Sequence, residues 1–69
     1  MYFHERLREL RELKGLNQTQ LGKLLNMSQK KISRLETGQT EPTTKEIIEI
    51  CKFFKVSADY ILGLSDKER

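Results

Sequence analysis

Glutamine, lysine, serine and arginine side chains recur at helical spacing over residues 28–37. They are Ser28, Gln29, Lys30, Lys31, Ser33, Arg34 and Thr37. Apolar Ile32 and Leu35 fall on the opposite side of the same helix, so the polar set is expected to point away from a core. Glutamine can pair with adenine and arginine or lysine with guanine, so such a helix could read base edges in the DNA major groove. The alternative is a charged face that meets only solvent.

Residues 18–37 as a whole predict two short helices joined by a tight turn. Ser28 precedes the second helix as an N-cap, Asn26 suits a left-handed turn position, and Gly22 stands where the helices would approach most closely. This interpretation requires that outward-pointing side chains have no partners within their own chain. The side chains concerned are Gln29, Lys30 and Arg34.

Length and composition favour one domain without a catalytic or metal site. With 69 residues, 36% hydrophobic and 33% charged, we expect one domain over residues 1–64 and a short tail over 65–69. A single Cys and a single His can form neither an internal disulfide nor a zinc site, so we expect no metal, no cofactor and no enzymatic activity. No apolar run approaches the roughly 18 residues of a membrane span, and the first residues do not resemble a signal peptide, so we expect a cytoplasmic location.

The positive charge is unevenly distributed. Residues 1–38 contain eight Lys/Arg against four Asp/Glu, whereas residues 39–69 contain five against six. The net charge of +3 therefore comes from the half that contains the candidate reading helix, as expected for a protein that meets nucleic acid.

The flanking segments predict three further helices. The stripe Phe3, Leu7 and Leu10, with Leu13 beside it, predicts a first helix that ends near Gly15. Its charged residues, Glu5, Arg6, Arg8, Glu9, Glu12 and Lys14, are expected to face solvent. Ile47, Ile50, Cys51 and Phe54 predict the buried stripe of a fourth helix, in which Cys51 acts as a small apolar residue. A fifth helix is expected over 58–62, followed by a frayed tail over 65–69.

Helix starts are marked by local chemistry. Asn17, Ser28, Thr43 and Ser57 are expected N-caps. Gln20 and Glu46 stand three residues after Asn17 and Thr43, which predicts two capping boxes.

The segments QTQLGKLLNMSQKKISRLETG and EPTTKEIIEICKFFKVSADYIL together resemble the Xre/Cro family of lambda-repressor-like helix-turn-helix proteins. The resemblance covers nearly the whole chain and implies an all-α fold of five helices, with the second and third forming the helix-turn-helix. It further implies that Gln29, Lys30, Ser33 and Arg34 face the major groove and that Gln18 contacts a backbone phosphate. Lys31, Thr37 and Gln39 are expected to meet phosphates, and Ser28 to lie at the same surface.

The resemblance also implies contacts within and between chains. Arg11 and Glu36 match positions that pair with each other, and we expect that role to be structural. A hydrophobic cluster near the carboxyl end is expected to join two subunits: Tyr60, Ile61, Leu62 and Leu64. The loop 39–44 contains Glu41 and no arginine, so a minor-groove arginine contact made by some relatives is not carried over.

The combined expectation is a sequence-specific regulator of transcription that binds double-stranded DNA. We expect a repressor that occupies a palindromic operator as a homodimer, with an antagonist or toxin-type protein as a further partner. The competing hypothesis is a protein-interaction module, an antitoxin or an adaptor, in which DNA binding is secondary.

Overall fold

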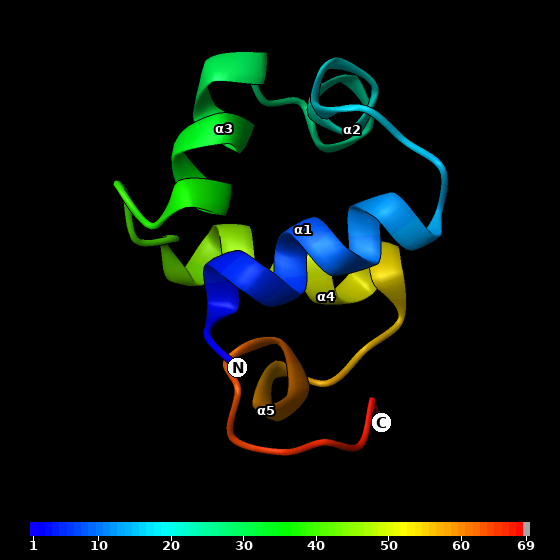
Figure 1. The fold of residues 1–69 in the computed structure, drawn as a ribbon, viewed down its shortest axis with the longest axis vertical. Coiled ribbons are helices and arrows are strands. Elements are labelled where there is room, and N and C mark those ends of the chain that lie inside the picture. Colours follow the sequence, from blue (N-terminus) through cyan, green and yellow to red (C-terminus); the bar gives the residue numbers. More distant parts are fainter. Residues whose placement is uncertain (69) are drawn as a thin grey trace.

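The computed structural model describes residues 1–68 and contains five helices in this range. They are α1 (Phe3–Leu13), α2 (Gln18–Leu25), α3 (Gln29–Thr37), α4 (Thr44–Phe54) and α5 (Ala58–Ile61). In Figure 1, α2 and α3 lie at one end of the molecule, α1 and α4 cross its middle, and α5 lies at the other end with both termini nearby. The expected all-α fold of five helices is confirmed. None of the described helices is long and apolar enough to cross a membrane.

Side-chain caps begin four of the helices, as the sequence predicts. Asn17, Ser28, Thr43 and Ser57 each accept a hydrogen bond from the backbone N–H three residues later, at 2.7–3.1 Å. Both capping boxes are present, because the Gln20 and Glu46 side chains accept from the N–H groups of Asn17 and Thr43 at 2.8 and 2.9 Å. Local chemistry therefore fixes where these helices begin.

The turn between α2 and α3 requires a left-handed residue and a residue without a side chain. Asn26 ends α2 with φ 58°, as expected. A Cβ atom placed on Gly22 would lie 2.5 Å from the Met27 carbonyl oxygen, so only glycine allows the turn to pack against α2 this closely. Among the non-glycine residues of 1–68, Lys55 after α4 is also left-handed (φ 58°), which the sequence did not predict.

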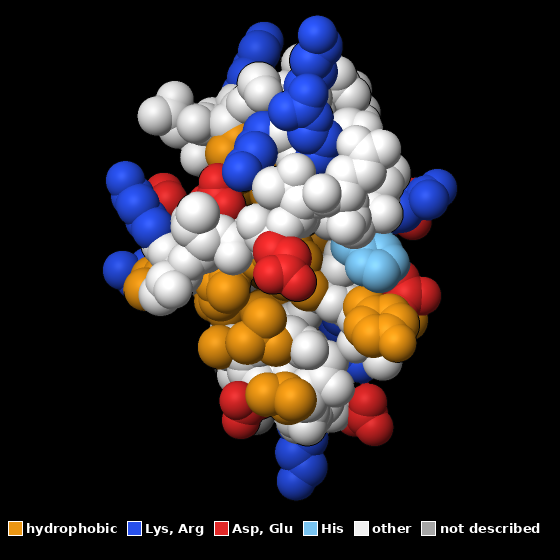
Figure 2. Space-filling model, turned by 90° about the vertical axis from the view of Figure 1, so that its left-hand side faces the viewer, with side chains coloured by type: hydrophobic (Ala, Val, Ile, Leu, Met, Phe, Trp, Pro, Cys, Tyr) orange, Lys and Arg blue, Asp and Glu red, His pale blue; other side chains and the backbone are white. Residues whose placement is uncertain are grey.

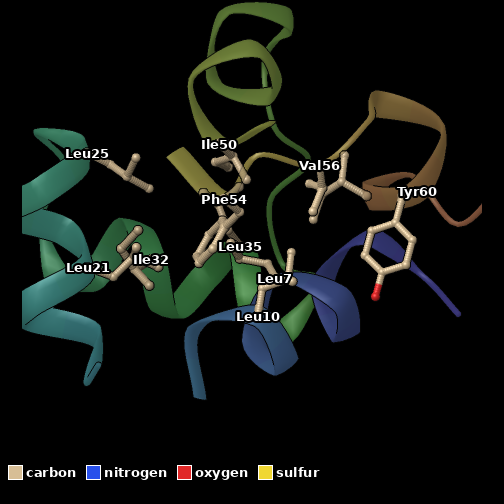
Figure 3. Close-up of a cluster of buried hydrophobic side chains, with 11 residues drawn as sticks. Leu7, Leu10, Leu21, Leu25, Ile32, Leu35, Ile50, Phe54, Val56 and Tyr60 are labelled. Atoms are coloured by element: carbon tan, nitrogen blue, oxygen red, sulfur yellow. The ribbon is translucent and has the colours of Figure 1, made fainter. Parts of the chain in front are cut away.

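The core lies between the helix-turn-helix and the α1, α4 and α5 helices (Figure 3). Its buried apolar residues are Leu7, Leu10, Leu21, Leu25, Ile32, Leu35, Ile50, Phe54, Val56, Tyr60 and Ile61. Ile47 and Cys51 pack partly buried against them, which confirms the predicted stripe of α4. Leu13 was expected beside the α1 stripe, but in the last turn of the helix it is 77% exposed.

Arg6 was expected to face solvent, and this prediction is wrong. It is buried because residues after α5 fold back over α1. Its Nη1 donates to the carbonyl oxygens of Tyr60 and Ser65 at 2.9 Å each, and its guanidinium lies 3.8 Å from the centre of the Tyr60 ring. The frayed tail is likewise not observed at Ser65, since its N–H donates to the Asp59 carbonyl. Arg69, the last residue of the predicted tail, lies outside the described residues.

Candidate nucleic-acid interface

The outer face of α3 exposes most of the residues predicted to contact DNA. Ile32 and Leu35 are fully buried and fix the orientation of the helix. The exposed predicted residues are Ser28, Gln29, Lys30, Arg34, Thr37 and, in the following loop, Gln39. Lys31 and Ser33 are partly buried at the edge of this face. Figure 2 shows Lys and Arg side chains gathered at the end of the molecule formed by α2 and α3, with hydrophobic side chains toward the other end.

Lys30 and Arg34 form neither a hydrogen bond nor an ion pair through their side chains among residues 1–68. Their positive charges are therefore available to a partner, as expected. Gln29 differs, because its amide nitrogen donates to the side-chain oxygen of Gln18 at 2.6 Å. The expectation that Gln29 has no internal partner is thus wrong, and the reason is that α2 begins directly beside the first turn of α3.

A chain of hydrogen bonds explains how Gln29 is oriented. A carboxylate can only accept, so Gln18 must present its amide nitrogen to Glu36 Oε1, at 3.2 Å. The Gln18 oxygen is left for Gln29, which must in turn present its own amide nitrogen. One N–H and the oxygen of the Gln29 amide remain unused by this chain. A bidentate pair with adenine requires one N–H and one oxygen of this kind.

Glu36 is the buried anchor of that chain. Its carboxylate accepts two hydrogen bonds from Arg11, at 2.6 Å from Nε and 3.0 Å from Nη2. The remaining Arg11 nitrogen, Nη1, donates to the Leu16 carbonyl oxygen at 2.7 Å. The hydrogen bond to Glu36 raises the pKa of Arg11, against the effect of burial. The structure thus contains the Arg11–Glu36 pair that the resemblance implies, and it joins α1 to α3 behind the exposed face.

Lys31 has an internal partner that the sequence did not indicate. Its Nζ lies 3.3 Å from Oε2 of Glu46, in the first turn of α4. Burial disfavours the charged form of Glu46, but the hydrogen bonds from Thr43 and Lys31 outweigh it, and the pKa of Glu46 lies below its ordinary value. The sequence marked Glu46 only as part of a capping box, because the approach of α4 to α3 has no local sequence pattern.

The remaining predicted residues lie at the ends of the two helices. Gln18 begins α2, where free amide groups favour an anion. The Thr37 hydroxyl donates to the carbonyl oxygens of Ser33 and Arg34 at 3.0 and 3.3 Å, so it is engaged with its own helix while its lone pairs stay available. Gln39 is exposed after the left-handed Gly38.

The predicted dimer residues divide into two classes. Tyr60 and Ile61 are 8% and 0% exposed and belong to the core of the single chain. Leu62 and Leu64 are 39% and 76% exposed. Only the latter two can supply apolar surface to a second subunit, because the first two are already covered by α1 and α4.

Comparisons with known proteins agree on one family. A family model described as helix-turn-helix matches residues 7–61. The chain is 40% identical over 63 residues to the HTH-type transcriptional activator BcrR of Enterococcus faecalis, covering 91% of this chain and 31% of BcrR. It is 30% identical over 63 residues to the HTH-type transcriptional regulator ImmR of Bacillus subtilis, covering 91% of this chain and 50% of ImmR.

A solved structure gives the same result for the fold. The P22 c2 repressor protein, crystallised in complex with synthetic operator 9T, superposes with a TM-score of 0.86 at 31% identity, over 94% of this chain and 98% of that one. The chain spans about a third of BcrR and half of ImmR, so the likeness concerns their helix-turn-helix parts. The match over residues 7–61 and the shared five-helix fold show that this chain belongs to the helix-turn-helix family.

Proposed function

We propose that this chain binds double-stranded DNA sequence-specifically, with α3 in the major groove. The observation that carries this proposal is the pair of exposed cations on α3, Lys30 and Arg34, which have no side-chain partner among residues 1–68, beside an amide that a buried network already orients. A face that served only solubility would not need Gln29 to be held in one orientation. The P22 c2 repressor, whose fold is similar, has been crystallised with an operator, which supports the assignment.

The side chains divide by what they can recognise. Gln29 suits adenine, and Lys30 and Arg34 suit guanine O6 and N7, with about 1–3 kcal/mol of discrimination for each good pair. Ser33 lies on the same face and can donate or accept. Gln18, Ser28, Thr37 and Gln39 are proposed to meet phosphates and so to set the position of α3 on the duplex.

We further propose that the protein acts as a dimer on a palindromic operator. Leu62 and Leu64 are exposed near the carboxyl end, and a two-fold axis through this region would place the same apolar surface on both subunits. Two α3 helices related in this way would lie about 34 Å apart, one turn of DNA. The proposed mode of action is repression, since occupying a promoter requires no contact with polymerase. Of the relatives, BcrR is named an activator and the P22 protein a repressor.

Selection from a random duplex pool, followed by titration of the selected site, tests DNA binding. Arg34→Ala should relax the base preference at one position of each half-site and weaken the selected duplex by about tenfold, since about 1.4 kcal/mol is tenfold. The matched control is Lys67→Ala, which removes the same charge from the segment after α5, at the other end of the molecule (Figure 1). It should leave base preference unchanged. If no duplex is enriched by the wild-type chain, the interaction-module hypothesis is favoured instead.

Sedimentation with and without the selected duplex tests the dimer. The wild type should bind with a stoichiometry of two chains per duplex, and Leu62→Glu/Leu64→Glu should bind a single half-site while keeping its helical content. These positions are exposed, so the substitutions should not disturb the core. A wild type that binds as a single chain at all concentrations would refute the dimer while leaving DNA recognition intact. In vitro transcription from a promoter that contains the selected site then distinguishes repression from activation.

A further inference from the structure

The Lys31–Glu46 ion pair lies directly beside the proposed reading face. Lys31 belongs to α3 and its side chain is 30% exposed, whereas the Glu46 side chain, on α4, is 16% exposed. Lys30 is adjacent in sequence and has no such partner among residues 1–68. Of these two neighbouring lysines, Lys30 can contact a ligand without losing an ion pair, whereas Lys31 is already paired with a carboxylate.

Glu46 is itself held in place by the start of its helix. Its Oε1 accepts the backbone N–H of Thr43 at 2.9 Å, and this leaves Oε2 for Lys31 Nζ at 3.3 Å. Each oxygen has its own partner, so the capping box holds the carboxylate in the position where it contacts Lys31. The lowered pKa of Glu46 agrees with a carboxylate that is ionised at neutral pH.

We propose that Glu46 restrains DNA binding by competing with the DNA backbone for Lys31. This inference rests on the proposed function and deepens it. A phosphate that approaches the edge of α3 must displace a carboxylate from Lys31 Nζ, because both are oxygen anions and seek the same N–H donors. Part of the binding free energy that the phosphate contact supplies is therefore spent on breaking the Lys31–Glu46 ion pair. Phosphate contacts carry no base information, so Glu46 sets the overall strength of binding and leaves base preference unchanged.

The test is Glu46→Gln in the full chain. A glutamine keeps the capping box, as Gln20 demonstrates at Asn17 in this same chain, but it no longer forms an ion pair. Removing one negative charge strengthens DNA binding in general, so the control is Glu49→Gln. Glu49 lies one turn later in α4, is partly buried and makes no ion pair among residues 1–68. Thermal unfolding monitored by circular dichroism verifies that both variants fold.

The expected result is that Glu46→Gln binds both the selected duplex and an unrelated duplex about two- to fivefold more tightly than Glu49→Gln does, the range expected for a partly exposed ion pair. In a Lys31→Met background this excess should vanish. Equal affinities for the two variants, or an excess that persists without Lys31, would overturn the proposal. So would a changed base preference, which would mean that Glu46 positions the reading residues. Failure of the wild type to bind any duplex would instead refute the proposed function itself.

Discussion

Two arginines of α1 have little exposed side chain, 9% for Arg6 and 11% for Arg11, and they are stabilised in different ways. Arg11 meets a carboxylate that is itself buried, since the Glu36 side chain is 2% exposed and accepts hydrogen bonds at 2.6 and 3.0 Å. Arg6 meets two backbone carbonyls, the face of the Tyr60 ring and Asp66, whose side chain is fully exposed. Arg11 neutralises a buried charge, whereas Arg6 holds a chain segment whose charged group, Asp66, is exposed.

Because their partners differ, the loss of Arg11 and the loss of Arg6 should have different consequences. Without Arg11, Glu36 would be a buried anion with only the Gln18 amide as a side-chain partner. Without Arg6, the carbonyls of Tyr60 and Ser65 would each lose a donor, but no buried charge would be left uncompensated, because Asp66 is fully exposed. Arg11 therefore supports the interface through Glu36 and Gln18, whereas Arg6 fixes the end of the chain that carries the proposed dimer residues.

The largest effect is expected for Arg11→Met. It should lower the free energy of unfolding by about 3–5 kcal/mol, because a buried carboxylate remains without its cation. Urea denaturation followed by circular dichroism measures the loss. If the variant does not fold, Arg11→Met/Glu36→Leu serves as the second measurement, since removing both charges should recover much of the stability. A double variant as unstable as the single one would show that the buried charge is not the cause.

Two kinds of feature were predicted from the sequence: those that depend on residues close together in the chain, and those that the family resemblance implied. N-caps, capping boxes and the α4 stripe depend on residues within one or two turns, and all were predicted correctly. The Arg11–Glu36 pair followed from the resemblance. Arg6 was missed because its main partners are carbonyl oxygens 54 and 59 residues away, and every residue has a carbonyl, so no residue type marks the site.

The candidate site likewise contains features that a local sequence pattern predicts and contacts between helices that it does not. The exposure of Gln29, Lys30, Arg34 and Thr37 on α3 follows from a helical period and was predicted from the sequence, although which side chain contacts which base stays a prediction. The Gln18–Gln29 and Lys31–Glu46 contacts join different helices, and their partners could be named only once the distances between helices were known. The left-handed Lys55 was missed because lysine is not a residue that favours this conformation.

A smaller effect is expected for Arg6→Met. Its loss should cost about 1–3 kcal/mol, because carbonyls lose their donors and the Tyr60 ring loses its cation. Asp66→Asn is the matched control and should leave the urea midpoint unchanged, since a fully exposed carboxylate contributes little to stability. A loss for Asp66→Asn equal to that for Arg6→Met would show that the ion pair, and not the carbonyl contacts, holds Arg6.

The smallest effect concerns the third pair, Lys31–Glu46, whose carboxylate side chain is 16% exposed and so lies between those of Glu36 and Asp66 in burial. The pKa of Glu46 is lowered in the folded chain from an ordinary value of 4.5. Its contribution to stability is therefore fully present above about pH 4.5 and is lost as the pH falls through the lower, folded value. Glu46→Gln lacks this contribution at every pH. The wild type should exceed it by less than about 1 kcal/mol at pH 7, and the difference should shrink in urea titrations at pH 4 and 3. A difference that stays constant from pH 7 to 3 would show that Lys31 does not stabilise the charged form of Glu46. In its contribution to stability, the Lys31–Glu46 pair would then resemble the Arg6–Asp66 pair more than the Arg11–Glu36 pair.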